Sequence, residues 1–234
     1  MPYVFSAHPQ AAVSVFDTAD RFPIRRIFCV GRNYADHVVE MGGDPDREQP
    51  FFFTKPADTV WQGEGEMPFA PRTGDLHHEA ELVVAIGRAG ANVDASQALD
   101  MVFGYAAGVD LTRRDLQAEA KKRGRPWDMS KGFDHSAPMS AVMPASLIGH
   151  PDAGRLHLTV NGETRQDGDL AQQVWKVPEI VAELSTYVAL APGDLIMTGT
   201  PAGVGPLFPG DHVVSSIEGI GEIAFTMGAK TDGS

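Results

Sequence analysis

Short apolar runs separated by polar turns recur along the chain, and they predict strands more often than helices. Residues 26–30 and 51–54 are runs of β-branched and aromatic side chains, which is typical of short buried strands. A third strand is expected over 81–87, and the apolar run 102–109 ends at Asp110. The pattern therefore predicts several short, buried strands.

Turn signals predict two hairpins in the second half of the chain. Residues 156–160 and 164–166 flank the Asn161–Gly162 pair, which tolerates positive φ and so favours a type I′ turn. A second hairpin is expected over 213–225, turning at 219–221.

Helices are expected to be few and short. The helical composition of 113–123 ends at Gly124, a residue type that commonly terminates helices. Residues 178–188 begin with a proline and place apolar side chains at helical spacing, which predicts a second helix. Two shorter helices are expected over 34–41 and 94–99.

The composition supports a strand-rich fold with one core. The chain has 234 residues, 43% hydrophobic and 21% charged, as in ordinary globular proteins. Its 25 glycines and 17 prolines favour short elements joined by turns. We therefore expect a β-rich α+β fold, with a loose N-terminal arm over 1–24, a single domain over 25–228 and a tail over 229–234.

Charge and targeting features narrow the choice of partners. With 19 basic and 31 acidic residues the formal charge is -12, which disfavours nucleic acids and anionic membrane surfaces. No apolar run approaches the ~20 residues that span a bilayer, and no basic and apolar leader opens the chain. The single cysteine, Cys29, excludes an internal disulfide. We expect a cytoplasmic protein that acts on a small molecule.

A cluster of acidic residues is the strongest candidate for chemistry. In a strand, Glu79 and Glu81 would point to the same face, and Asp110 could add a third carboxylate. Three oxygen ligands without cysteine favour a hard ion such as Mg²⁺, Mn²⁺ or Ca²⁺. His77 shares the parity of the glutamates and could be a ligand or support one. Alternatively, these acids are simply solvated.

Two further groups could take part in catalysis. On a helix, His37 and Glu40 would be neighbours, so that the carboxylate orients the imidazole as a general base; a surface pair is the alternative. Lys131 could stabilise a developing anion, or it could simply be exposed.

A glycine-rich loop could bind a small carboxylate. Residues 198–205 offer backbone N–H groups and hydroxyls without bulky side chains. No Gly-Lys-Ser/Thr, G-x-S-x-G, H-E-x-x-H or Rossmann glycine motif occurs, which argues against P-loop, serine hydrolase, zincin and dinucleotide-binding proteins.

Five short motifs then occur in a characteristic order: Val30-Gly31-Arg32-Asn33-Tyr34, Phe53-Thr54-Lys55-Pro56, His78-Glu79-Ala80-Glu81-Leu82, Gly108-Val109-Asp110 and Thr198-Gly199-Thr200-Pro201. Together they resemble the fumarylacetoacetate hydrolase family, in particular its short acylpyruvase branch. The resemblance implies a mixed, strongly bent β-roll with short helices, which usually forms a homodimer.

The resemblance also implies roles for individual residues. By position, the ligands of Mg²⁺ or Mn²⁺ would be Glu79, Glu81 and Asp110. His37 and Glu40 would activate water, and Lys131 would face the reacting carbon. Substrate contacts are implied for residues scattered over the chain, namely Arg32, Lys55, Arg114, Gln117 and Thr200.

The implied reaction is hydrolysis of the C–C bond of a 2,4-dioxo acid, with fumarylpyruvate, an intermediate of gentisate catabolism, as the favoured substrate. Family members with the same residues also include oxaloacetate decarboxylases and tautomerases. A more remote alternative is a non-catalytic binding protein that uses the carboxylates to hold a structural ion.

Overall fold

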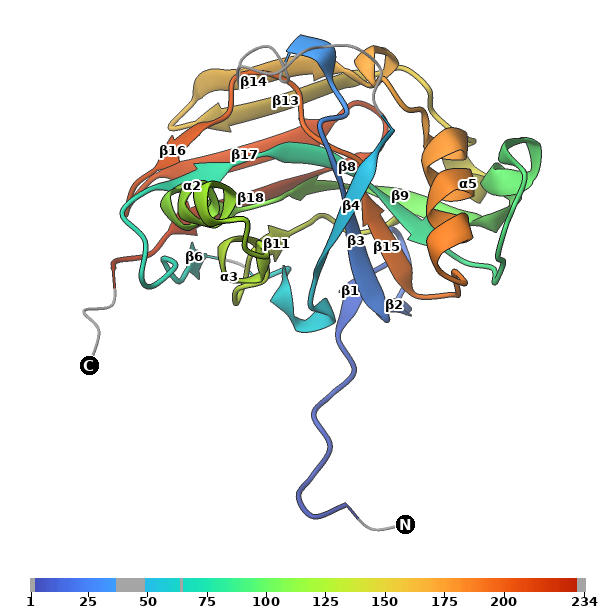
Figure 1. The fold of residues 1–234 in the computed structure, drawn as a ribbon, viewed down its shortest axis with the longest axis horizontal. Helices are drawn as coiled ribbons and strands as arrows, with labels where there is room; N and C mark the ends of the chain where they lie inside the picture. Colours follow the sequence, from blue (N-terminus) through green and yellow to red (C-terminus); the bar gives the residue numbers. More distant parts are fainter. Residues whose placement is uncertain (1–2, 37–48, 64, 231–234) are drawn as a thin grey trace.

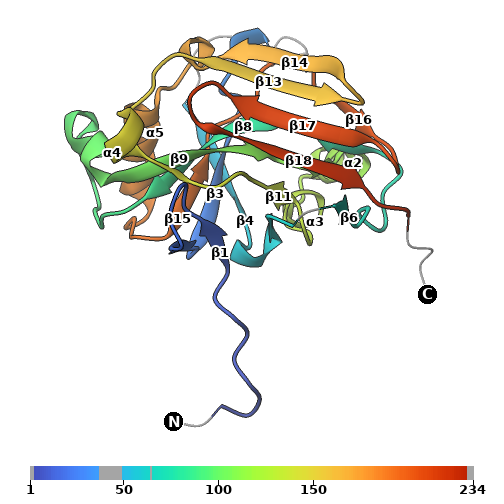
Figure 2. The same cartoon turned by 180° about the vertical axis from the view of Figure 1, so that it is seen from behind.

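The computed structural model describes residues 3–36, 49–63 and 65–230. Among them, one mixed sheet has six strands in the order β12 (Met143–Pro144), β9 (Val102–Val109), β8 (Ala80–Ile86), β15 (Asp194–Met197), β3 (Arg26–Gly31) and β4 (Phe51–Lys55). A second has five in the order β14 (Glu163–Asp169), β13 (Arg155–Val160), β17 (His212–Ile217), β18 (Gly221–Met227) and β6 (Glu66–Met67). Figures 1 and 2 show the two sheets from opposite sides.

Smaller strand groups and short helices complete the fold. The strands are β10 (Thr112–Arg113), β7 (Leu76–His78) and β16 (Gly205–Leu207) in one sheet, β1 (Ala12–Ser14) with β2 (Arg21–Pro23), and β11 (Ala137–Pro138) with β5 (Val60–Trp61). The α-helices are α2 (Arg114–Arg123), α3 (Asp128–Lys131), α4 (Ala145–Ile148) and α5 (Val177–Tyr187), and the 3-10 helices are η1 (Ala57–Thr59), η2 (Ala95–Met101) and η3 (Leu170–Gln172). The predicted β-rich α+β fold is confirmed.

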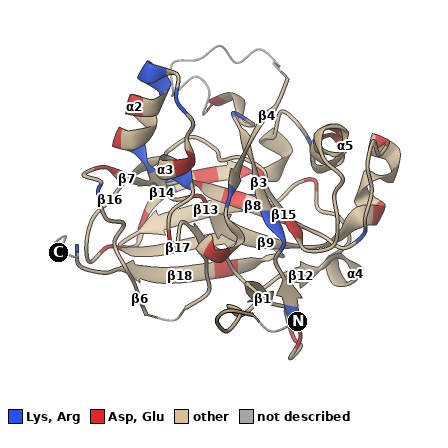
Figure 3. Ribbon diagram, turned by 60° about the horizontal axis from the view of Figure 1, so that its bottom comes forward, with Lys and Arg blue, Asp and Glu red and all other residues tan. Residues whose placement is uncertain are grey.

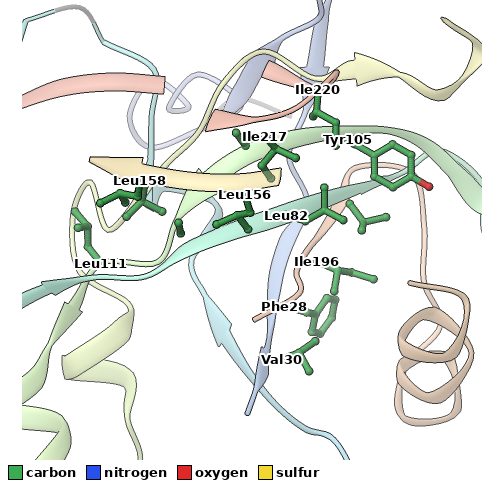
Figure 4. Close-up of a cluster of buried hydrophobic side chains, with 14 of the residues drawn as sticks. Phe28, Val30, Leu82, Tyr105, Leu111, Leu156, Leu158, Ile196, Ile217 and Ile220 are labelled. Carbon is green, nitrogen blue, oxygen red and sulfur yellow. The ribbon is translucent and has the colours of Figure 1, made fainter. Parts of the chain in front are cut away.

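Strand β8, inside the six-stranded sheet, is buried at every position, which explains why it is apolar apart from Glu81. Along β8, Leu82 and Val84 point into the main core, whereas Val83 and Ala85 point into a second apolar cluster. The main core also takes in side chains of the five-stranded sheet. Figure 4 shows Leu82 in this core with Leu156 and Ile217.

The expectation of a loose arm over 1–24 is wrong for its second half. Strands β1 and β2 form an antiparallel hairpin. Its Val13 and the adjacent Ile24 are fully buried in the second apolar cluster. The hairpin covers an apolar face of the six-stranded sheet. The segment contains too few apolar residues for its sequence pattern to predict this packing. Residues 3–10 extend away from the body (Figure 1).

The two predicted hairpins are confirmed. Strands β13 and β14 join through Asn161 (φ 54°) and Gly162 (φ 79°), the left-handed pair that a type I′ turn requires. Strands β17 and β18 form the second hairpin, and Gly219 adopts φ 72° in its turn.

The helix predictions are confirmed for the residues that the structure describes. Helix α2 ends at Gly124 in the left-handed conformation, and α5 carries a proline in its first turn. The segment expected to be helical over 94–99 is the 3-10 helix η2, capped by Asp94. The helix predicted over 34–41 falls mostly in 37–48, outside the described residues. No helix among the described residues has the length and apolar character that crossing a membrane would require.

Candidate active site

Strand pairing brings the three predicted carboxylates together. Strands β8 and β9 are antiparallel, with Ala80 opposite Val109. Glu79 precedes β8 and Asp110 follows β9, so the two residues meet, and the Asp110 N–H donates to the Glu79 carbonyl at 2.8 Å. One carboxylate oxygen from each of Glu79, Glu81 and Asp110 lies within 4.8 Å of the others, and all three residues are buried.

Cationic side chains from three other elements surround this carboxylate cluster. Lys131, at the end of α3, donates to Glu79 Oε2 at 2.8 Å and to Asp110 Oδ2 at 2.6 Å. Burial acts to lower the pKa of Lys131, but the charges of Asp110 and Glu79 outweigh it and raise the pKa. Lys131 is therefore held as an ammonium, which can stabilise an anion but cannot accept a proton.

The other two cations, Arg114 and Lys55, bind the remaining carboxylate oxygens of Glu79 and Asp110. Arg114, which begins α2, forms an ion pair with Glu79 Oε1, and its second terminal nitrogen donates to Gln117 Oε1 at 2.7 Å. The Lys55 ammonium lies 2.7 Å from Asp110 Oδ1 and also donates to the carbonyls of Leu111 and Lys131. Charged partners at these distances offset the cost of burying carboxylates.

Glu81 is the carboxylate of the cluster whose negative charge is least offset by nearby cations. Its Oε2 accepts a hydrogen bond from the Gly199 N–H at 2.7 Å. Burial, together with the charges of Asp110 and Glu79, raises its pKa well above the ordinary value. Buried oxygen donors with repelling charges fit a hard divalent cation, which would relieve the repulsion. The three carboxylates are thus able to hold such an ion.

Two members of the carboxylate cluster, Glu79 and Glu81, line a cavity. One wall is aromatic, because the Trp127 ring packs edge-on against Phe51 and Phe53 with centroid distances of 5.5 and 5.8 Å. The cavity is lined by Val30, Gly31, Arg32, Phe51, Phe53, Glu79, Glu81, Arg114, Gln117, Lys121, Trp127, Lys131, Gly199 and Thr200.

The cavity contains most of the predicted substrate contacts. Arg32, Arg114, Gln117 and Thr200 line it, as does Lys131. These side chains come from four separate segments of the chain.

Other candidates lie elsewhere. Lys55 is fully buried against Asp110, so the structure does not bring it to the cavity. His77 pairs with Asp75 at 2.8 Å and is not part of the carboxylate cluster. His37 and Glu40 lie outside the described residues, so the water-activating pair stays a prediction.

Gln166 on β14 supports the site and was missed by the sequence analysis. Its side-chain oxygen accepts from the Ala80 N–H at 2.9 Å, and its nitrogen donates to Thr200 Oγ1 at 2.7 Å and to the Pro201 carbonyl at 2.9 Å. It is fully buried. In the sequence Gln166 is one polar residue in a polar hairpin strand, so no local signal marks it.

Comparison with known proteins agrees with this geometry. Residues 26–227 match the family described as fumarylacetoacetate (FAA) hydrolase C-terminal. A fumarylpyruvate hydrolase of Ralstonia sp. is 44% identical over 185 residues, which cover 79% of this chain and 96% of that protein. The mitochondrial oxaloacetate tautomerase FAHD1 of Mus musculus is 44% identical over 204 residues, covering 87% and 91% of the two chains.

A solved structure is similar over almost the whole chain. The fumarylpyruvate hydrolase of Pseudomonas aeruginosa, solved in complex with Mn²⁺ and pyruvate, has a TM-score of 0.96 and 44% identity, and the match covers 98% of this chain and 100% of that one. Sequence, fold and the buried Glu79–Glu81–Asp110 cluster therefore agree, and the chain belongs to the fumarylacetoacetate hydrolase family.

Proposed function

We propose that the protein is a divalent-metal-dependent hydrolase that cleaves an acylpyruvate, with fumarylpyruvate as the favoured substrate and fumarate and pyruvate as the products. The observation that carries the proposal is the buried cluster of three carboxylates, two of which, Glu79 and Glu81, line a cavity that also presents cations. The 44% identity to fumarylpyruvate hydrolases from two bacteria supports the choice of substrate.

Glu79, Glu81 and Asp110 would hold the ion, which we propose to be Mg²⁺ or Mn²⁺, with Ca²⁺ as a substitute. A bound divalent ion polarises the carbonyl oxygen of a 2-oxo acid and so favours enolate formation. Lys131 and Gly199 hold the carboxylates in place through the contacts described above. The Arg114–Gln117 pair and the Thr200 hydroxyl would contact the carboxylate end of the substrate.

The hydrolytic step itself would use His37, oriented by Glu40. His37 accepts a proton from water as the water oxygen bonds to C4, and the C3–C4 bond then breaks. The electron pair of that bond stays with the pyruvate fragment as its enolate, whose negative charge the Lys131 ammonium stabilises. Protonation at C3 completes pyruvate, and the acyl fragment leaves as a carboxylic acid.

The second candidate is an oxaloacetate tautomerase or decarboxylase that uses the same carboxylates. It is favoured by the 44% identity to the mouse tautomerase. Both reactions form an enolate of a 2-oxo acid, but neither needs water to attack a carbonyl. The two functions therefore differ in their dependence on a general base for water.

Turnover assays distinguish these functions. We expect the Mg²⁺- or Mn²⁺-loaded protein to cleave fumarylpyruvate, and EDTA to abolish this activity until metal is restored. His37→Ala should lower the rate by about 10²–10⁴-fold, the usual contribution of a general base. Oxaloacetate turnover that survives this substitution, without cleavage of fumarylpyruvate or acetylpyruvate, would establish the second candidate instead.

We further propose that the protein is a homodimer that works in the cytoplasm, in gentisate catabolism, as the family resemblance implies. Sedimentation equilibrium at micromolar concentration tests the dimer. A monomer under those conditions would contradict it.

A further inference from the structure

Four cations line the cavity, and two of them are committed to the carboxylate cluster. Arg114 binds Glu79 and Gln117, and Lys131 binds Glu79 and Asp110. Both cations therefore act at the carboxylate cluster, where the proposed function places the 2-oxo acid end of the substrate. Lys121 also lines the cavity, as does Arg32, which has an interaction of its own.

Lys121 is placed at the cavity by the last turn of α2, whose basic residues Figure 3 shows in blue. Its Nζ lies 5.1 Å from the centroid of the Trp127 ring, which is within the range of a cation–π contact. Within 3–36, 49–63 and 65–230, no carboxylate forms a salt bridge with Lys121. The ring thus holds a lysine that makes no direct ion pair with a described acid.

The electrostatic surroundings of Lys121 favour an anionic ligand. Partial desolvation lowers the pKa of this lysine, and the positive charges of Arg114 and Arg32 lower it further and outweigh the negative charge of Glu79. A cation that is both partly desolvated and repelled by other cations gains more from a bound carboxylate than a solvated surface lysine does. The neighbouring Lys122 does not line the cavity.

We propose that Lys121 binds the distal carboxylate of a dicarboxylic 2-oxo acid and so makes the enzyme select dicarboxylic over monocarboxylic acylpyruvates. The inference deepens the proposed function and rests on it for the position of the 2-oxo acid end at the carboxylate cluster. The aromatic wall of Phe51, Phe53 and Trp127 is suited to a flat, conjugated acyl chain between the two ends.

Calorimetric binding tests the inference without requiring turnover. The probes are 2-oxoheptanedioate and 2-oxoheptanoate, which share the 2-oxo acid end and chain length but differ in the distal carboxylate. With Mg²⁺ present, wild-type protein should bind the diacid at least fivefold more tightly than the monoacid. Lys121→Met should reduce this preference to less than twofold, whereas the matched control Lys122→Met should retain it.

Two results would overturn the inference: a preference for the diacid that survives Lys121→Met, or a wild-type protein that binds both probes equally. If Arg32→Met alone removes the preference, the distal carboxylate binds Arg32 and the assignment to Lys121 is wrong. If Lys121→Met lowers the affinity for both probes equally, Lys121 has a general role in the cavity, and the inference is wrong.

Kinetics separate this inference from the proposed function. For Lys121→Met we expect kcat/KM for fumarylpyruvate to fall at least fivefold and kcat/KM for acetylpyruvate to change less than twofold. If the wild-type protein cleaves neither substrate, the proposed hydrolysis fails, and the binding experiment still decides the role of Lys121.

Discussion

Gly199 both adopts a backbone conformation that favours glycine and donates a hydrogen bond to a carboxylate of the site. Its φ of 95° lies in the region that side chains disfavour, and a Cβ built there would come within 2.8 Å of Asn33 Cβ. Its N–H donates to Glu81. Glycine is therefore required both for the turn and for the close approach that positions a carboxylate.

Gly199→Ala should thus lower both stability and activity. We expect a loss of about 2–4 kcal/mol in the free energy of unfolding, since positive-φ strain adds to a steric clash. Gly210→Ala is the matched control, because Gly210 has φ 89° but a Cβ added there would meet no heavy atom within 4 Å. Urea unfolding and kcat/KM are the measurements. If both substitutions lower stability and kcat/KM equally, backbone strain at positive φ accounts for the loss and the contact with Asn33 does not.

Among the carboxylates, Glu81 should be the most informative single substitution. Glu81→Gln removes a charge but keeps the shape of the side chain, so Mn²⁺ affinity should fall at least tenfold while the fold persists. Glu66→Gln, on an exposed residue of β6, is the control. Calorimetric titration with Mn²⁺ and a circular dichroism melt test both points, and unchanged Mn²⁺ affinity would remove Glu81 from the proposed ligand set.

At the scale of elements, the β13–β14 hairpin reaches the active site through Gln166. This side chain connects the start of β8 to the loop after β15 by hydrogen bonds that leave its polar atoms satisfied. The hairpin is therefore part of the structure that positions Thr200. A turn that is easily recognised in the sequence thus supports a site whose residues lie far away along the chain.

Gln166→Ala should leave the Ala80 N–H and the Thr200 hydroxyl without their buried partner. Each unsatisfied buried group costs about 1–3 kcal/mol, so we expect a clear loss of stability together with a raised KM. Gln97→Ala, on an exposed residue of η2, is the control and should be neutral. Thermal melts and steady-state kinetics measure both quantities. A stable variant with normal KM would contradict a positioning role for Gln166.

At the scale of the whole molecule, the N-terminal hairpin closes the second apolar cluster. Ile24→Ala should cost about 2–5 kcal/mol, the usual range for truncating a large buried aliphatic side chain, because Ile24 is completely buried. Val4→Ala, at a fully exposed position, should change stability by less than about 0.5 kcal/mol. Chemical denaturation compares the two variants, and equal stabilities would show that the hairpin is dispensable.

Local physics in the sequence determined the elements of this protein. Apolar runs predicted β3, β4 and β8, the Asn161–Gly162 pair predicted a type I′ hairpin, and Gly124 marked the end of α2. These features depend on backbone preferences and burial of nearby residues, which a short stretch of sequence contains. The acidic residues Glu79, Glu81 and Asp110 were also recognisable, because their types and order resemble a known family.

Only the tertiary structure decided which groups act together. The β8–β9 register brings Asp110 to Glu79, and the packing of α3 inserts Lys131 between them. The same packing keeps Lys55 away from the cavity and assigns Gln166 to the Thr200 loop. These contacts join residues that are 21 to 55 positions apart in the chain. Their partners depend on strand pairing and side-chain packing over the whole fold, and no local pattern encodes either.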